Sequence, residues 1–97
     1  MALDMQDIAR IDALMAALGA GAGAGSGADH LREGLARLLP GLGQRSCDVD
    51  DVLEEPFRQL GAIGLHLLDT SGHCIRLTTD PAEATALLLA TPQELRA

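Results

Sequence analysis

The residues best suited to metal or thiol chemistry are Cys47, His66, His73 and Cys74. A structural zinc site needs four such ligands to converge. His73 and Cys74 are adjacent, and neighbouring residues of a strand point to opposite faces, so they cannot easily hold one ion. Cys47, His66 and Cys74 could still meet on one sheet face as a weak metal or redox site, although the cysteines lack a C-x-x-C spacing. Buried, unreactive cysteines are the simpler interpretation.

A second group of interest is a run of carboxylates that follows Cys47. Hard cations such as Ca²⁺ prefer clustered carboxylate oxygens, but an EF-hand loop that starts at Asp48 fails. Its fifth, sixth and twelfth positions hold Val52, Leu53 and Gln59, where the loop needs a ligand, a glycine and a glutamate. We therefore expect a solvated acidic loop that can also serve as a docking patch. Its acidic members are Asp48, Asp50, Asp51, Glu54 and Glu55.

The sequence carries no assembled motif for nucleophilic catalysis or phosphate binding. Asp69 and His73 would be neighbours across a turn, yet the nearest hydroxyls, Thr70 and Ser71, lie in that turn without evident oxyanion donors, so a structural hydrogen bond is favoured. The glycine-rich run 19–27 lacks the Gly-Lys-Ser/Thr ending of a phosphate loop and follows a helix pattern rather than a strand. We expect a flexible linker there, and a protein that is not an enzyme and has no cofactor.

The element that would position these groups is a β-hairpin over residues 63–78. Both of its segments alternate in the period of two that is typical of half-buried strands. A three-residue turn, Thr70–Gly72, would pair Leu67 with Ile75 and Leu65 with Leu77, which makes one face wholly apolar. The opposite face would then be exposed. Together with the acidic loop it supplies the predicted partner-binding residues, which are His66, Leu68, Cys74, Arg76, Asp48, Asp50 and Asp51.

Two amphipathic helices are predicted before the hairpin. Residues 3–18 place apolar side chains at helical spacing, and residues 26–39 do the same after a capping pair, Ser26 and Asp29. The first stripe could pack within the domain or against a second copy, and a domain this small favours the intramolecular choice. The stripes are Ile8, Ile11, Leu14, Met15 and Leu18 in the first, and Leu31, Leu35, Leu38 and Leu39 in the second.

After the hairpin, a C-terminal helix is predicted. Asp80 can cap it, Pro81 suits its first position, and Glu83 stands where a capping-box acid belongs. This helix would run to residue 90 and be followed by a frayed tail, residues 92–97. A third strand, residues 44–49, is expected antiparallel beside the strand that begins at residue 63.

Composition limits the class of protein. The 97 residues suit a single small domain, and 7 basic against 14 acidic side chains give a net charge of −7. This charge argues against nucleic acid or an anionic membrane as the main partner. No apolar run approaches the roughly 20 residues of a membrane span, and the first residues carry acids where a signal peptide needs bases. A cytoplasmic protein with reduced cysteines is expected.

Residues 47–90 also carry a family resemblance. The patterns C-D-x-D-D, L-H-L-x-D, G-H-C and T-x-D-P-A-x-A-T look like those of a small bacterial protein family of unknown function, associated with nitrogen-fixation or redox gene clusters. The resemblance covers about half of the chain. It implies the unit of hairpin and helix and a metalloenzyme context, and it brings no catalytic residues.

The sequence therefore predicts an α+β fold with two N-terminal helices, a three-stranded antiparallel sheet with a hairpin, and a C-terminal helix. The predicted function is a non-enzymatic accessory or protein-interaction module of a bacterial cytoplasmic system, linked to a metalloenzyme. One alternative is a metal-binding or thiol-redox module that uses Cys47, Cys74 and His66. A lesser alternative is a structural homodimer joined through the first helix or an exposed strand edge.

Overall fold

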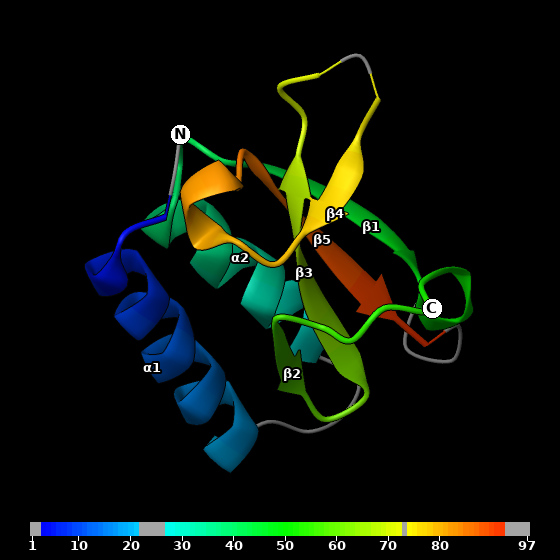
Figure 1. Ribbon diagram of the computed structural model, residues 1–97. Helices are drawn as coiled ribbons and strands as arrows, with labels where there is room; N and C mark the ends of the chain where they lie inside the picture. The colour runs from blue at the N-terminus through cyan, green and yellow to red at the C-terminus, as the bar shows by residue number, and fades with distance from the viewer. Residues whose placement is uncertain (1–2, 22–26, 73, 93–97) are drawn as a thin grey trace.

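The computed structural model describes residues 3–21, 27–72 and 74–92 (Figure 1). Within these ranges, two helices precede a mixed sheet, and two short 3₁₀ turns interrupt the later chain. In chain order the elements are α1 (Met5–Gly21), α2 (Gly27–Leu38), β1 (Gly43–Asp48), η1 (Val49–Asp51), β2 (Arg58–Leu60), β3 (Ile63–Asp69), β4 (Arg76–Thr78), η2 (Pro81–Glu83) and β5 (Ala86–Thr91).

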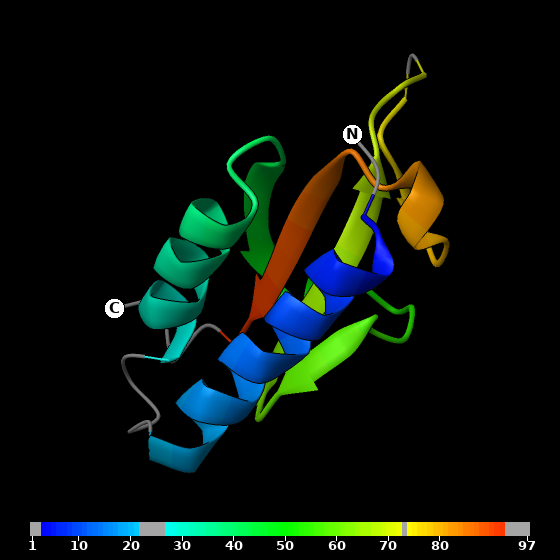
Figure 2. The ribbon, with the colours of Figure 1, turned by 90° about the vertical axis from the view of Figure 1, so that its left-hand side faces the viewer.

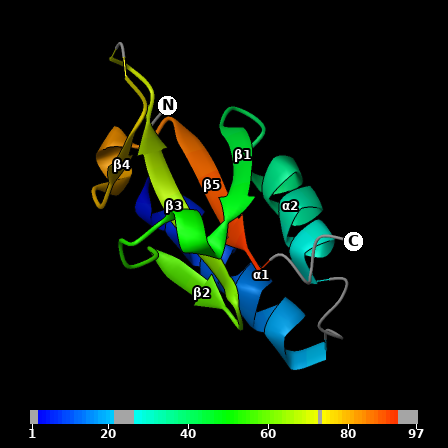
Figure 3. The same ribbon diagram turned by 90° about the vertical axis from the view of Figure 1, so that its right-hand side faces the viewer.

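The sheet has five strands, with β3 and β5 at its centre. The order is β1-β5-β3-β2, and β4 also pairs with β3. β2 lies along the first half of β3, where Arg58 is opposite Leu65, and β4 lies along the second half, where Leu68 is opposite Leu77. Among the pairs formed by the described strands, only β1–β5 is parallel. Figure 3 shows this sheet nearer the viewer, with both helices behind it.

Both predicted N-terminal helices are confirmed, and they lie side by side on one face of the sheet (Figure 2). Ile11, Leu31 and Leu35 are fully buried there against Leu65 and Leu89 of the central strands. This burial explains why helices with an apolar stripe form in this chain. The predicted linker, residues 19–27, is helical at its two ends, since α1 runs to Gly21 and α2 starts at Gly27. The rest of the linker and the Ser26 cap lie outside the described residues.

The predicted C-terminal helix is wrong. Asp80 does cap a helical start and accepts a hydrogen bond from the Ala82 amide at 2.9 Å, but only the single turn of η2 follows. The next residues form β5, in which all but Leu88 are buried. A short apolar run suits a central strand covered on both faces as well as it suits a helix. Here β1 and β3 supply hydrogen-bond partners for the backbone of β5. These residues therefore form a strand, although the residues before them carry the signals of a helix N-terminus.

The predicted three-stranded antiparallel sheet is also wrong. The expected strand at residues 44–49 does exist, as β1 (Gly43–Asp48), but it is an edge strand parallel to β5 and does not pair with β3. The reason is that β5 occupies the place beside β3, with Leu65 opposite Leu89 and Leu67 opposite Leu87.

The predicted hairpin register is wrong as well. Leu68 pairs with Leu77 and Asp69 with Arg76, instead of Leu67 with Ile75. All seven residues of β3 are buried, so both of its faces accept apolar neighbours and the alternation of side chains could not select one register. The expected pairing of Asp69 with His73 lies outside the described residues. Ile75, which was assigned to the core, is 47% exposed in the loop.

Candidate functional site

The outer face of the sheet, opposite α1 and α2, carries Gly64, His66 and Leu68 of β3. Both predicted partner-binding residues on this strand, His66 and Leu68, were expected to be exposed. They are only 5% and 3% exposed. His66 is covered in part by the connection from β1 to β2, which crosses in front of β3 (Figure 1). A Cβ atom added at Gly64 would lie 3.3 Å from Pro56 Cβ of this connection, which shows how closely the two segments approach.

Where the connection leaves the face uncovered, a pocket of about 240 Å³ remains. We call it the His66 pocket. Within the described part of the chain, the His66 ring makes no hydrogen bond. Burial lowers the pKa of His66, and the nearby Glu54 carboxylate partly opposes this shift. The ring is therefore neutral at pH 7 and keeps a free acceptor nitrogen. The pocket is lined by Glu54, Glu55, Pro56, Phe57, His66, Leu67, Leu77, Thr78 and Thr79.

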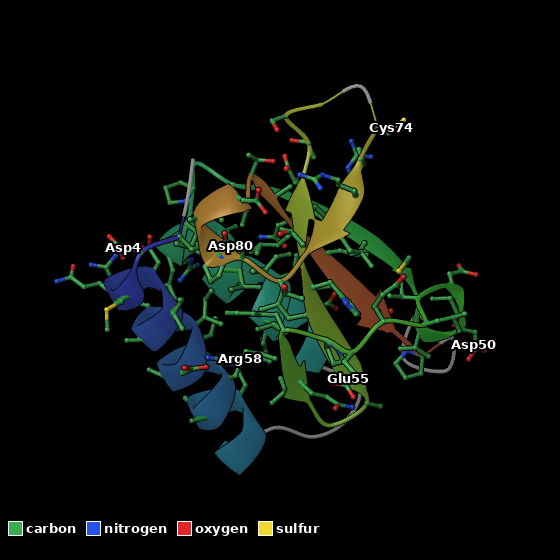
Figure 4. All side chains as sticks on the ribbon, viewed as in Figure 1. Asp4, Asp50, Glu55, Arg58, Cys74 and Asp80 are labelled. Atoms are coloured by element: carbon green, nitrogen blue, oxygen red, sulfur yellow. The ribbon has the colours of Figure 1, made fainter. Side chains whose placement is uncertain are left out.

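The carboxylates after β1 form an exposed surface, which we call the acidic connection (residues 48–55). Asp48 is half-buried and accepts a hydrogen bond from the Asp50 amide at 3.0 Å, which caps η1. The other four acidic side chains are exposed, and Figure 4 shows Asp50 at the margin of the fold. Leu53, in the middle of this run, is 94% exposed. The predicted exposure of the acidic loop is confirmed for these four side chains, but the sequence gave no indication that Leu53 projects from it.

The two remaining predicted partner-binding residues lie elsewhere. Cys74 is exposed in the loop between β3 and β4, at the far end of the hairpin (Figure 4), and the Arg76 side chain is 65% exposed. Arg76 donates to Asp69 Oδ2 at 2.9 Å and lies 3.9 Å from Glu83 Oε2. The predicted partner-binding residues therefore do not form one surface, since they divide between the acidic connection, the buried outer face and this hairpin.

The three weak metal candidates are also not brought together. Cys47 lies in β1 opposite Ala90, His66 is buried in β3, and Cys74 lies in the hairpin loop. In the ranges that the structure covers, no three His, Cys, Asp or Glu side chains are grouped so that they could hold a metal ion.

The residues that sequence reasoning missed are those that complete the His66 pocket from other segments. Phe57 precedes β2, whereas Leu77 and Thr79 lie in β4 and directly after it, so they come from two distant parts of the chain. Phe57 also packs against the core from a partly buried position. No local pattern marks these residues as a group, because their proximity depends on the path of the connection over β3.

Comparisons with protein-family models, with curated proteins and with solved structures gave no match to this chain. In the described residues, neither helix is long and apolar enough to cross a membrane. What the site can do is therefore inferred from its own shape and charge.

Proposed function

We propose that this protein is a non-enzymatic interaction module that binds a basic protein partner through the acidic connection. The observation that carries this proposal is the position of Leu53, which is 94% exposed among the exposed carboxylates of Asp50, Asp51, Glu54 and Glu55. A single exposed leucine is ordinary on a protein surface. An apolar side chain with a rim of one charge, however, matches the usual anatomy of a contact surface. The net charge of −7 adds long-range attraction for a basic partner.

The polar groups near the sheet end support a role without catalysis. The Ser71 hydroxyl donates to Asp69 Oδ1 at 2.6 Å, and the Thr78 hydroxyl donates to Glu83 Oε1 at 3.2 Å. The hydrogen bonds from Ser71 and from Arg76 lower the pKa of Asp69 to about 2. A carboxylate with so low a pKa is a weak general base near neutral pH, so it would not activate the Ser71 hydroxyl as a nucleophile.

The resemblance of residues 47–90 to a bacterial family associated with nitrogen-fixation or redox genes suggests the kind of system in which the partner works. The unit of hairpin and helix that it implied ends in a strand instead. We therefore take only the context from it, an accessory role beside a metalloenzyme, and take the contact surface from the geometry.

The test is capture of a partner with the immobilised protein from a native bacterial extract, followed by binding measurements with the captured protein in purified form. Leu53→Ser should weaken the purified complex by about tenfold or more, as expected for a central apolar contact. Ile75→Ser is the matched control, because Ile75 is also an exposed apolar residue but lies in the hairpin loop.

We expect a basic protein whose affinity falls with added salt, is about tenfold or more weaker for Leu53→Ser and is retained in Ile75→Ser. Equal affinity of the wild type and Leu53→Ser would contradict the proposal. So would the conversion of a small molecule by the purified protein.

A further inference from the structure

The His66 pocket has the size of a site for one side chain. Its volume is about 240 Å³. Pockets for drug-sized ligands usually occupy roughly 300–1,000 Å³. The occupant is therefore a small group, such as a single side chain of a partner that already contacts the adjoining acidic connection.

The walls of the pocket divide into an apolar part and an anionic part. Pro56, Phe57 and Leu77 supply apolar surface, and Glu54 and Glu55 supply two exposed carboxylates. Long basic side chains bury an aliphatic stem along apolar surface while the charged head stays near water and anions. The two parts of the pocket match the two parts of such a side chain.

The His66 ring supplies an independent indication of a ligand. It is more than nine-tenths buried, it lines the pocket, and it has no hydrogen-bond partner among the described residues. Its ring nitrogens are not among the described polar atoms that are fully enclosed without a partner, so they remain open to solvent, and a donor that enters the pocket can hydrogen-bond with them. Ammonium and guanidinium groups carry only donors, so they suit a neutral imidazole nitrogen together with two carboxylates.

We infer that the His66 pocket receives a lysine or arginine side chain of the basic partner, with its charged head held between His66, Glu54 and Glu55. This inference rests on the proposed function, because the acidic connection brings the partner to the pocket. It adds a specific anchor to what would otherwise be general attraction between opposite charges.

The test uses small probes on the purified chain, so it needs no partner. Nα-acetyl-lysine methylamide is titrated into ¹⁵N-labelled protein, and its neutral counterpart, Nα-acetyl-norleucine methylamide, is titrated in parallel. The lysine probe should cause saturable shifts of the Gly64 and Leu77 amides and of the His66 ring, and the norleucine probe should cause none.

Two double variants that remove the same charge distinguish binding in the pocket from general attraction to the negatively charged surface. Glu54→Gln with Glu55→Gln should weaken lysine-probe binding about fivefold or more, because these side chains line the pocket. Asp50→Asn with Asp51→Asn removes the same charge from the same connection but does not touch the pocket, so binding should stay within about twofold. All four side chains are exposed, so both double variants should fold.

Three results would overturn the inference: no saturable binding of the lysine probe, equal binding of the norleucine probe, or equal weakening by both double variants. Each of these leaves the proposed function standing if Leu53 still governs capture of the partner. Conversely, probe binding by a chain that captures no basic protein would overturn the assignment to a partner's side chain, and the proposed function with it.

Discussion

Asp69 and Arg76 face each other at the end of the β3–β4 ladder, where Arg76 Nη2 donates to Asp69 Oδ2 at 2.9 Å. The two side chains differ in environment, because Asp69 is 6% exposed and Arg76 is 65% exposed. The other oxygen of Asp69 accepts hydrogen bonds from the Ser71 amide and hydroxyl at 2.9 and 2.6 Å. The Asp69 carboxylate at the end of β3 thus holds Ser71 in the following loop and Arg76 at the start of β4.

Asp69→Asn should remove part of the acid dependence of stability. The hydrogen bonds from Ser71, followed by the one from Arg76, lower the pKa of Asp69 from 3.8 to about 2. A carboxylate whose pKa is lowered by folding contributes its full stability at pH values above its pKa in the unfolded chain. This contribution is lost as pH falls towards about 2, the pKa of Asp69 in the folded protein. The variant should be less stable at neutral pH, and its free energy of unfolding should change less over this acid range. Urea unfolding at several pH values measures both effects. If the free energy of unfolding of the variant depended on acid pH as it does in the wild type, the lowered pKa would not belong to Asp69.

His66 should titrate below its ordinary pKa of 6.5. Burial lowers this pKa, and the Glu54 carboxylate partly raises it again, so Glu54→Gln should lower it further. The lowered pKa means that the unfolded chain binds the proton of His66 more readily than the folded protein does. Neutral His66 therefore contributes its full stability to the folded protein above pH 6.5, and this contribution is lost as pH falls through the pKa of His66 in the folded protein. An NMR titration of the ring in both proteins measures the shift. A higher pKa in Glu54→Gln would show that Glu54 does not face the ring.

Leu65 and Leu53 should respond very differently to the same substitution. Leu65 is fully buried between the sheet and the helices, so Leu65→Ala should lower the free energy of unfolding by about 2–5 kcal/mol. Leu53 is 94% exposed, so Leu53→Ala should change it by no more than about 0.5 kcal/mol. Chemical denaturation of both variants provides the comparison. A large loss of stability in Leu53→Ala would mean that this side chain packs within the fold and does not face a partner.

Arg58 ties β2 to α1 through a two-pronged ion pair with Asp12, at 2.6 Å from Nε and 3.3 Å from Nη2. Both side chains are more than a third exposed, so water and salt weaken the attraction. A double-mutant cycle with Asp12→Asn and Arg58→Gln should give a coupling energy of about 0.5–1 kcal/mol that decreases at high salt. The 4.4 Å contact of Arg58 with the Phe57 ring is lost in both Arg58 variants, so it cancels in the cycle. A coupling of zero at low salt would show that the pair adds nothing to stability.

The sequence by itself determined the features that depend on neighbours along the chain. The helical spacing around Ile11 and Leu35 specified α1 and α2, since one apolar stripe is enough to bury a helix on a sheet. Asp80 was correctly recognised as a cap, and the run of carboxylates after Cys47 was correctly predicted to be largely exposed.

Only the tertiary structure decided what becomes of the apolar runs. Residues 86–91 could form a helix or a central strand. They form the strand β5 because β1 and β3 supply its hydrogen bonds. The register of β3 with β4 was open for a related reason, since β3 is buried on both faces. His66 lines a pocket because the connection from β1 to β2, which precedes β3 in the chain, crosses its face. Each outcome depends on contacts between distant segments, which local periodicity does not encode.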